Sequence, residues 1–505
     1  MALFQWLPEE SRFILLLFPT ILFLILLMNY AYIDCYRKGK LPPGPPKLPV
    51  IGNLHQLRSL PHLSLHSLAK KYGPIIYLQL GWVPTVVISS AKMAKEVMRN
   101  YDHVLSSRPR LFAANFLLYN STDITFSPYG AYWRHIRKIC ALELLSAKRV
   151  QSFRPVREEE VARMVHRIQD SSCSVSVNLT KILGLYANDV LCRVAFGRDF
   201  SRGGDYDSLG FQEMIEELEE LLGGFSIGDF FPSVEKFIHR LTGMTKRLED
   251  TSRRFDELLD RILREHANRR FSGSRKDAHM LLNYRYRSMA EGAAKQVENK
   301  SDLDMFAAGT DTSFITLDWA MTELIINMKA MERAKSEVRS VVGEREFVLE
   351  TDVPQMPYLN AVIKEIFRLH PPAPVLVPRE SMEEIAVDAY RIPTKTRFYI
   401  NAWSIGRDPL AWENPEEFKP ERFLNSTIDY KGQDFELIPF GTGRRMCPGI
   451  MFGLVTVELA LAQLLHSFDW ELPSGVKPED LDMTEVFGLT MHRRAELVLV
   501  AKPCF

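Results

Sequence analysis

The chain has 505 residues, of which 46% are hydrophobic and 25% charged, and this composition excludes a disordered, collagenous or low-complexity protein. Its 63 Lys and Arg residues balance its 63 Asp and Glu residues, so nucleic-acid binding through bulk basicity is disfavoured. Six cysteines are too few and too scattered for a disulfide scaffold, and we interpret them as reduced thiols.

The first expected element is a membrane-spanning helix. Residues 13–33 form a run of 21 uncharged residues rich in Leu, Ile and Phe. A helix of this length spans roughly 31 Å, which matches the hydrocarbon core of a bilayer. Because Arg37, Lys38 and Lys40 follow the run, the positive-inside rule places the rest of the chain in the cytosol. We therefore predict a membrane anchor over residues 1–36, with a buried core helix as the alternative.

A basic and proline-rich hinge is predicted over residues 37–48. The run PPGPP at residues 42–46 cannot continue a helix and favours a stiff, polyproline-like geometry. It is expected to hold a globular body off the membrane. No linker, repeat or long low-complexity run follows, so residues 49–505 are expected to form a single domain.

That domain is expected to be mainly α-helical with a minor β-sheet. A β-hairpin is predicted from residues 75–80 and 85–89, joined through residues 81–84, and a helix is predicted to begin at Ala91. Later segments show the apolar period of helices. The predicted helices cover residues 211–222, 255–266, 315–326, 358–369 and 451–468, and shorter β-prone pieces cover residues 398–400 and 496–501.

A cysteine-containing loop, PFGTGRRMCPG at residues 439–449, is the most informative stretch of the chain. Cys447 stands just before an expected helix, beside two arginines and among glycines that leave backbone amides exposed, which favours a thiolate. A lone cysteine holds iron only where a macrocycle supplies the other ligands, so the pattern points to haem. Zinc is disfavoured because no second Cys or His lies at ligand spacing.

This loop resembles the haem-binding motif of the cytochrome P-450 monooxygenases, and three further motifs stand in the order expected for that family. They are AGTDTS at residues 308–313, similar to the oxygen-activation motif of the central helix, EIFR at residues 365–368, similar to the Glu-x-x-Arg pair, and PERF at residues 420–423. The residues of these motifs are most similar to those of plant microsomal enzymes of specialised metabolism. The resemblance implies the cytochrome P-450 fold with an N-terminal transmembrane helix.

The resemblance also implies roles for individual residues. Haem b is expected to have Cys447 as the axial thiolate ligand of its iron. Asp311 and Thr312 are the expected catalytic residues, which relay protons to the bound oxygen. The residues expected to bind the haem propionates are Trp133, Arg137, Arg379 and Arg445, although each arginine taken singly is an ordinary surface residue. The residues expected to form a buried structural triad are Glu365, Arg368 and Arg422.

Two readings of the oxygen-activation motif stay open. Small residues at this spacing pack helices together in many proteins. In the resembled family, Gly309 instead leaves room beside the iron.

The segments that line the substrate pocket in the resembled family present apolar side chains here. They are Phe112, Phe116, Leu117, Ala307, Ala308, Val375, Leu376, Phe487 and Leu489. A lining of this kind implies a lipophilic substrate that is oriented by shape rather than by charge. For each of these residues, a place in the hydrophobic core is an equally weighted alternative.

One segment departs from the family pattern. Members usually carry a long apolar helix before the oxygen-activation motif, whereas residues 295–304 read KQVENKSDLD, and residues 273–294 also look unlike the family. Only Val297 and Leu303 are apolar in that run, so no helical stripe survives. We expect an altered front half of the central helix, which would affect the roof of the pocket and catalysis more than haem binding.

Taken together, the motifs predict a membrane-anchored haem-thiolate monooxygenase. It is expected in the endoplasmic reticulum membrane as a single-pass protein whose catalytic domain faces the cytosol. Its expected substrate is a small lipophilic plant metabolite such as a terpenoid, phenolic compound or alkaloid, oxidised with O2. Two alternatives stay open: a catalytically impaired haem protein or scaffold, motivated by residues 273–304, and a haem isomerase or dehydratase.

The electrons are expected from another protein. The chain has no flavin or nicotinamide fingerprint, so an NADPH-cytochrome reductase is the expected donor. Arg134, Lys138 and Arg444 form a candidate docking patch for an acidic surface of that reductase, with scattered solvated cations as the alternative.

Overall fold

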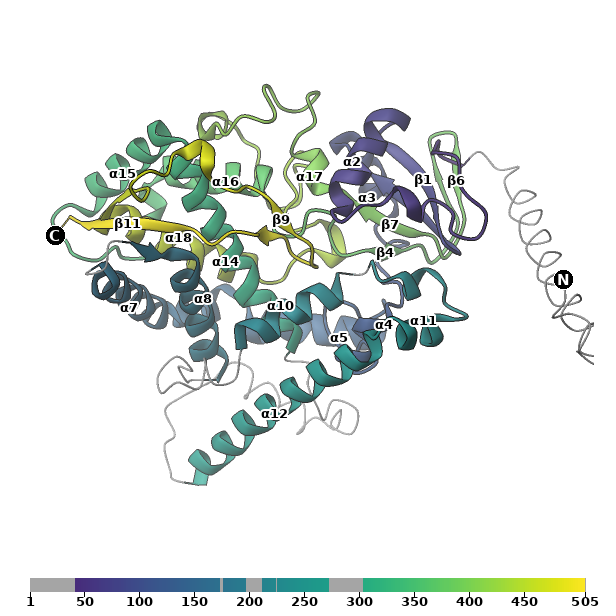
Figure 1. Cartoon of the computed structure of the whole chain (residues 1–505), viewed down its shortest axis with the longest axis horizontal. Helices are drawn as coiled ribbons and strands as arrows, with labels where there is room; N and C mark the ends of the chain where they lie inside the picture. The colour runs from purple at the N-terminus through teal and green to yellow at the C-terminus, as the bar shows by residue number, and fades with distance from the viewer. Residues whose placement is uncertain (1–40, 173–175, 197–210, 224, 272–302, 505) are drawn as a thin grey trace, which may run out of the picture.

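The computed structural model describes residues 41–172, 176–196, 211–223, 225–271 and 303–504 (Figure 1). The membrane anchor predicted over residues 1–36 lies outside these residues, as does most of the atypical segment 273–304. The described part of that segment is its last two residues, with which helix α14 (Leu303–Ile326) begins.

The described chain is mainly helical, as predicted. The other α-helices are α2 (Pro61–Tyr72), α3 (Ala91–Tyr101), α4 (Phe112–Leu117), α5 (Ala131–Ile139), α6 (Ala147–Ser152), α7 (Arg154–Ser172), α8 (Leu179–Phe196), α10 (Phe211–Leu222), α11 (Glu235–Leu241), α12 (Met244–Phe271), α15 (Met328–Val342), α16 (Pro357–Leu369), α17 (Ala402–Ile405) and α18 (Ile450–Ser467). Four of the five predicted helices match an observed helix or lie inside one, and the fifth, residues 451–468, extends one residue beyond α18. The predicted start at Ala91 is confirmed, because Ser90 caps α3 by accepting a hydrogen bond from the Met93 amide.

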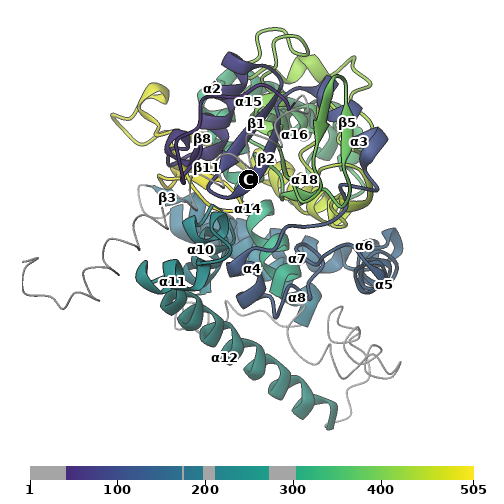
Figure 2. The ribbon, with the colours of Figure 1, turned by 90° about the vertical axis from the view of Figure 1, so that its right-hand side faces the viewer.

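Helix α14 runs through the middle of the molecule and packs against α8, α16 and α18 (Figures 1 and 2). Its residues Ile315, Trp319 and Leu324 are fully buried, and they belong to the largest apolar cluster of the protein. Helix α18 is apolar around its whole circumference, and of the described helices it is the one that is long and apolar enough to cross a membrane. It is a core helix instead, since 72% of it is buried inside the body.

The minor sheet has the strand order β1 (Ile75–Leu80), β2 (Val83–Ile88), β7 (Arg397–Ile400) and β4 (Arg379–Glu380). The predicted hairpin is present, but its connection is shorter than expected, because Leu80 pairs with Val83 and Gln79 with Pro84. Gly81 makes the short turn possible with a φ of 58°. Pro84 lies one residue before β2 starts to pair with β7, so its missing N–H removes no bond between those two strands.

Smaller sheets complete the fold. β3 (Val177–Asn178) and β8 (Phe468–Glu471) flank β11 (Val498–Pro503), while β5 (Ile385–Val387) pairs with β6 (Tyr390–Ile392) and β9 (Glu485–Val486) with β10 (His492–Arg493). The strand predicted at residues 496–501 therefore begins and ends two residues later than expected.

The second half of the predicted hinge lies against the body. The Pro43 carbonyl accepts a hydrogen bond of 2.9 Å from the Tyr77 amide in β1. Gly44 permits this approach, because a Cβ atom there would lie 2.1 Å from the Tyr77 carbonyl oxygen. Pro43 and Gly44, inside the predicted hinge, therefore lie against β1.

Candidate active site

The Cys447 loop joins the short 3-10 turn at Gly443–Arg445 to α18. The Cys447 amide donates to the Phe440 carbonyl at 2.9 Å, and the Gly449 amide points at the Cys447 sulfur at 3.4 Å. The thiol is solvent-accessible, although the loop encloses it enough that desolvation raises the pKa of Cys447, opposed by the Gly449 amide and Arg137. Of the four cysteines in the described ranges, Cys447 is the exposed one.

The oxygen-activation motif forms the first turns of α14. Ala308 is exposed and Thr312 half-buried, so the face of the helix that carries these two residues is not fully covered by packed side chains. The Thr312 hydroxyl donates to the Ala308 carbonyl at 2.7 Å, while the Asp311 carboxylate accepts a hydrogen bond from Thr490 near the C-terminus. Helix packing explains Gly309, because a Cβ atom there would lie 3.1 Å from two methyl carbons of Leu191 on α8. The space that Gly309 leaves is therefore filled by α8.

Four arginines converge near Cys447. Arg137, Arg379 and Arg445 were expected there, and Arg137 donates to the Met446 carbonyl beside the cysteine. The fourth, Arg108, was not predicted from the sequence. It is buried and donates to the carbonyls of Thr125, Val377 and Pro378 at 2.7–2.9 Å. The signal that could have revealed it is a cation between two serines and a proline, in a loop without helical or strand period.

Positive charge in this cluster exceeds negative charge. Burial lowers the pKa of Arg108 and Arg379, and burial together with repulsion from Arg379 lowers the pKa of Arg445 to about 9. The carboxylates among these groups are Asp102, which pairs with Arg379 at 3.1 Å, and Asp123, which is fully enclosed. Because Arg444 also pairs with Asp102 at 3.1 Å, the two carboxylates compensate only part of the positive charge, and the haem propionates would compensate more of it.

The donor set around Cys447 therefore fits haem. Among the described residues, no group of three or more His, Cys, Asp or Glu side chains could hold a metal ion. A single accessible thiol with uncompensated positive charge beside it suits a macrocycle that brings its own iron ligands and two carboxylates.

Trp133 supports this cluster through its ring. The Arg445 guanidinium lies over the indole at 3.9 Å, and the indole N–H donates to the Ile124 carbonyl at 2.9 Å. The structure therefore places Trp133 in the predicted site, with its donor engaged by the backbone and its face holding Arg445.

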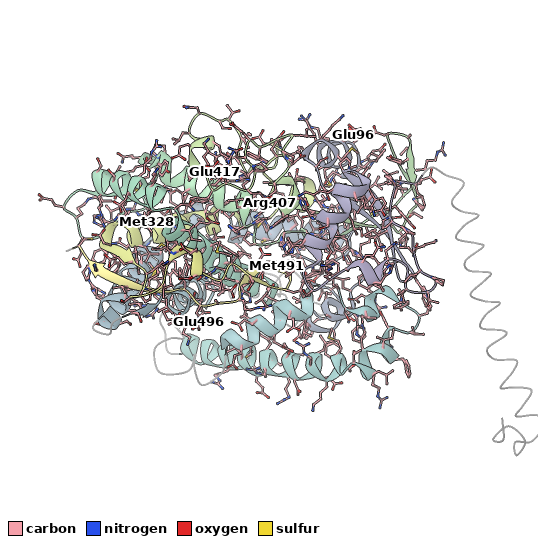
Figure 3. All side chains as sticks on the ribbon, turned by 45° about the horizontal axis from the view of Figure 1, so that its top comes forward. Glu96, Met328, Arg407, Glu417, Met491 and Glu496 are labelled. Carbon is pink, nitrogen blue, oxygen red and sulfur yellow. The ribbon has the colours of Figure 1, made fainter. Side chains whose placement is uncertain are left out.

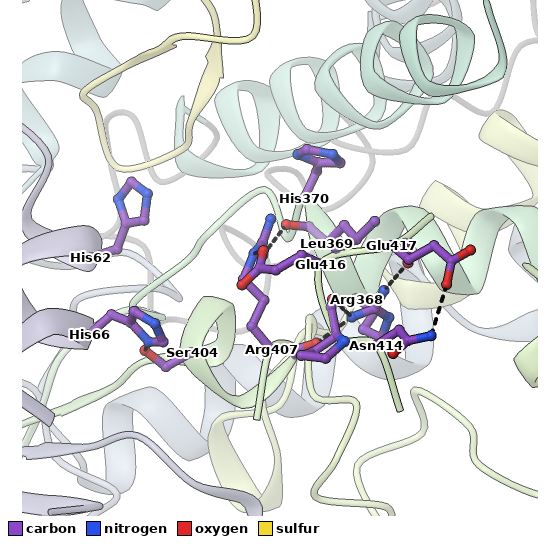
Figure 4. Close-up of polar contacts among 12 residues, drawn as sticks. His62, His66, Arg368, Leu369, His370, Ser404, Arg407, Asn414, Glu416 and Glu417 are labelled. Carbon is purple, nitrogen blue, oxygen red and sulfur yellow. Dashed lines mark hydrogen bonds and ion pairs between the residues drawn. The ribbon is translucent and has the colours of Figure 1, made fainter. Parts of the chain in front are cut away.

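The three residues of the predicted triad meet in the core beneath α16. Arg368 forms a bidentate pair with Glu365 at 2.7 and 2.8 Å, and Arg422 contacts the same carboxylate at 3.0 Å. Arg368 also donates to the Glu417 carbonyl at 3.0 Å, and the neighbouring Arg407 donates to the Leu369 carbonyl at 2.6 Å (Figure 4). Because Glu365 and Arg368 are fully buried and saturated with partners, the network fixes the loop that follows α17 against α16.

Comparison with known proteins decides the family. The family model named Cytochrome P450 matches residues 42–500. The chain belongs to the cytochrome P450 family. It is 65% identical to Cytochrome P450 71AP13 of Prunus mume, over 100% of this chain and 98% of that protein. It is 45% identical to premnaspirodiene oxygenase of Hyoscyamus muticus, over 96% of this chain and 97% of that protein. The predicted family, fold and cofactor class are therefore confirmed, and the protein is a haem-thiolate monooxygenase.

A solved structure shares the fold. A zebrafish cytochrome P450 solved with abiraterone superposes with a TM-score of 0.71, and the match covers 88% of this chain and 100% of that chain at 24% identity. At this identity the likeness speaks for the fold alone.

The predicted pocket residues of this P450 divide into two groups. Phe112, Val375, Leu376, Phe487 and Leu489 are half-buried, and Ala308 and Phe116 are exposed, so these side chains have surface that no protein atom covers. Leu117, in contrast, is 1% exposed and packs in the main core, as its alternative reading predicts. The side chain of Ala307 lies outside the part of the structure that is described.

Aromatic contacts join the pocket segments. Phe112 stacks on His239 of α11 with ring centroids 4.2 Å apart, and Phe487 meets Phe225 edge-on at 5.9 Å. Gly223 fits closely against Phe487, because a Cβ atom at Gly223 would lie 2.8 Å from that ring. The C-terminal turn is thereby held against the end of α10.

The candidate docking cations occupy two places. Arg134 and Lys138 are one helical turn apart and exposed on α5. Arg444 is exposed too, but it pairs with Asp102 at 3.1 Å, so part of its charge is already compensated.

Proposed function

We propose that this cytochrome P450 oxidises a small lipophilic plant metabolite at a haem held by Cys447. Arg108, Arg137, Arg379 and Arg445 would bind the propionates, and Glu365, Arg368 and Arg422 would hold the surrounding fold. The observation that carries the proposal is the accessible Cys447 thiol beside a buried arginine cluster with surplus positive charge.

The chain's own residues then have separate tasks. Haem supplies oxygen activation when it is bound. The apolar side chains of Phe112, Val375 and Phe487 orient the substrate by shape and keep water away. Asp311 would carry a proton at its carboxyl group, and the Thr312 hydroxyl would pass a proton into the haem pocket.

The substrate class is supported by two observations. Seven of the nine predicted pocket side chains keep uncovered apolar surface, and none of the nine is charged. The relative from Hyoscyamus muticus is named as an oxygenase of premnaspirodiene. A hydrophobic small molecule of plant specialised metabolism, such as a terpenoid, phenolic compound or alkaloid, fits both.

Membrane attachment and the electron donor belong to the same proposal. Residues 1–36 would cross the endoplasmic reticulum membrane once and leave the catalytic domain in the cytosol. An NADPH-cytochrome reductase would supply electrons, with Arg134 and Lys138 offering an exposed basic edge to its acidic surface. Deletion of residues 1–36 should move the protein from the microsomal pellet to the supernatant, and continued sedimentation would contradict the anchor.

The carbon monoxide difference spectrum tests the haem-thiolate site. The reduced full-length protein should show the thiolate-specific Soret band, and Cys447→Ala should abolish it. Cys504→Ala is the matched control, because Cys504 is a partly buried free thiol away from the site. A Cys447→Ala protein that keeps the band would show that another residue ligates the iron.

A metabolite screen separates the proposal from its alternatives. Microsomes that contain the chain and a reductase should convert a lipophilic plant metabolite only when NADPH is present. Turnover without NADPH would indicate a haem isomerase or dehydratase. An intact Soret band without conversion of any compound would favour an impaired haem protein, the reading that residues 273–304 motivate.

A further inference from the structure

Three segments meet at a pair of buried acids. Glu219 comes from α10, Asp311 from α14 and Thr490 from the turn between β9 and β10. The Thr490 hydroxyl lies 3.2 Å from the Glu219 carboxyl group and is also hydrogen-bonded to Asp311. All three side chains are buried, with 6–7% of their surface exposed.

The backbone holds this arrangement in place. The Leu489 amide donates to the Glu219 carbonyl at 2.8 Å, and the Met491 amide donates to the Pro372 carbonyl at 2.9 Å. Figure 3 shows Met491 near the middle of the molecule, where the C-terminal segment crosses it. A Cβ atom at Gly488 would lie 2.8 Å from the Thr490 carbonyl oxygen, so glycine allows the tight turn.

The hydroxyl bridge requires a proton on one of the acids. A hydroxyl group has one hydrogen, so Thr490 can donate to one carboxylate only. The second contact is a hydrogen bond only if the other carboxyl group is protonated and donates to the Thr490 oxygen. If both carboxylates were ionised, one of them would face the lone pairs of the Thr490 oxygen, which is a repulsive contact.

The surroundings favour a retained proton. Within the described ranges, no ion pair joins Glu219 or Asp311 to a lysine or arginine. Burial raises the pKa of both groups, and burial together with repulsion from Asp311 raises the pKa of Glu219 to about 8. Two other groups face the pair: Glu216 on α10 raises the pKa of Asp311, and His492 on β10 lowers it.

Other nearby charges are engaged elsewhere. Arg247 of α12 pairs with Glu217 at 2.8 Å and Glu220 at 2.9 Å on another face of α10. Arg493, the residue after His492, lies 3.6 Å from Asp318.

We propose that Glu219 is a positioning residue for oxygen activation, which holds a proton and returns it to Asp311 through Thr490. This inference rests on the proposed role of Asp311. The Thr490 hydrogen moves to the Asp311 carboxylate as the Glu219 proton moves to Thr490, and Asp311 then gives up this proton toward Thr312. Glu219 then takes a proton from solvent by way of Glu216, which is exposed one helical turn away. Each transfer moves one proton, and no group changes its oxidation state.

An infrared difference measurement on the full-length holoprotein tests the retained proton without any substrate. Spectra taken at about pH 6 and about pH 9 should differ by the C=O band of a buried carboxylic acid that titrates near neutral pH. Glu219→Gln should abolish this band, since an amide cannot ionise. Glu220→Gln is the matched control, because it removes an exposed acid from the next position of the same helix. A spectrum unchanged by Glu219→Gln would overturn the proposal.

Oxygen-dependent NADPH oxidation in the reconstituted enzyme, without added substrate, tests the transfer. Glu219→Gln should lower the rate about tenfold and increase the solvent deuterium isotope effect, while the carbon monoxide spectrum stays normal. The wild-type rate should fall above about pH 8, where Glu219 loses its proton, and the variant should lack that step. A lowered rate with an unchanged isotope effect and pH profile would show a merely structural role.

The two proposals fail differently. If Asp311→Asn slows NADPH oxidation but Glu219→Gln leaves the rate and isotope effect unchanged, the Glu219 inference is wrong and the role of Asp311 stands. If neither variant changes the rate, the proton relay through Asp311 itself is wrong.

Discussion

Two buried carboxylates in this P450 have opposite surroundings. Glu365 is fully buried and accepts charge-assisted hydrogen bonds from Arg368 and Arg422. Asp311 is buried almost as completely, yet its hydrogen-bond partner is the neutral Thr490 and its close neighbour is a second acid, Glu219. A compensated charge is fixed and builds structure, whereas an uncompensated acid keeps a mobile proton. The contrast separates the residues proposed to support the haem site from those proposed to carry protons.

The largest expected effect is the loss of the compensated charge. Glu365→Gln should lower the free energy of unfolding by about 3–5 kcal/mol, because it leaves two arginines without their buried anion. Denaturant unfolding of the purified holoprotein measures this change. Glu417→Gln is the control, since Glu417 contacts Arg368 through its backbone carbonyl while its side chain is exposed. Equal midpoints for the two variants would mean that the triad does not stabilise the fold.

The second effect should appear in turnover rather than in stability. Asp311→Asn should reduce NADPH oxidation about 100-fold, because an amide cannot carry the proton. The free energy of unfolding of Asp311→Asn should be equal to or higher than that of wild type, because the substitution removes a carboxyl group that Glu219 repels.

Asp318 provides the matched position for that experiment. It lies two turns further along α14, is also buried, and is compensated by Arg493 and by Thr180 at 2.6 Å. Asp318→Asn should therefore lower stability and spare turnover. If Asp311→Asn and Asp318→Asn change turnover and stability in the same way, ion pairing does not distinguish the roles of these two acids.

Long periodic elements of this fold were predictable from local pattern. The helix over residues 211–222 was predicted at its observed bounds because its apolar face repeats over three turns. The hairpin is present, but its second strand begins two residues earlier than predicted. Proline is typical of turns, so the sequence pattern did not indicate that Pro84 pairs with Gln79 inside the strand. Motif resemblance supplied Cys447 and the residues of the triad.

Contacts between distant segments could not be predicted in the same way. Arg108 stands in an irregular loop, and its neighbours Val377 and Pro378 are about 270 residues away in the chain. Glu219 reads as one of several acids on an amphipathic helix, most of which face solvent. Its partner Thr490 is 271 positions away, so burial became visible only in the folded molecule.

A third prediction concerns the arginine cluster, which is a region of surplus positive charge. Arg108→Leu should speed the loss of haem to an excess of apomyoglobin by about tenfold, because a charge-assisted hydrogen bond to a propionate disappears. In the haem-free protein, relief of the repulsion from Arg445 and Arg379 should partly offset the loss of the three hydrogen bonds from Arg108 to backbone carbonyls. Arg110→Leu is the control, because Arg110 is 58% exposed and pairs with Glu235. Equal rates of haem loss in both variants would exclude Arg108 from propionate binding.

The smallest effect is a pH dependence of stability that the acid pair creates. Burial raises the folded-state pKa of Glu219 from 4.5 to about 8, so between these values the folded protein binds more protons than the unfolded chain. Stability from this group is therefore complete below about pH 4.5 and is lost as the pH rises toward about 8. Because Asp311 shares the proton, we expect a loss of about 1–2 kcal/mol across this window in wild type. Urea unfolding at a series of pH values should show a flatter profile for Glu219→Gln than for wild type or Glu220→Gln. Parallel profiles for all three proteins would place the proton elsewhere than on Glu219.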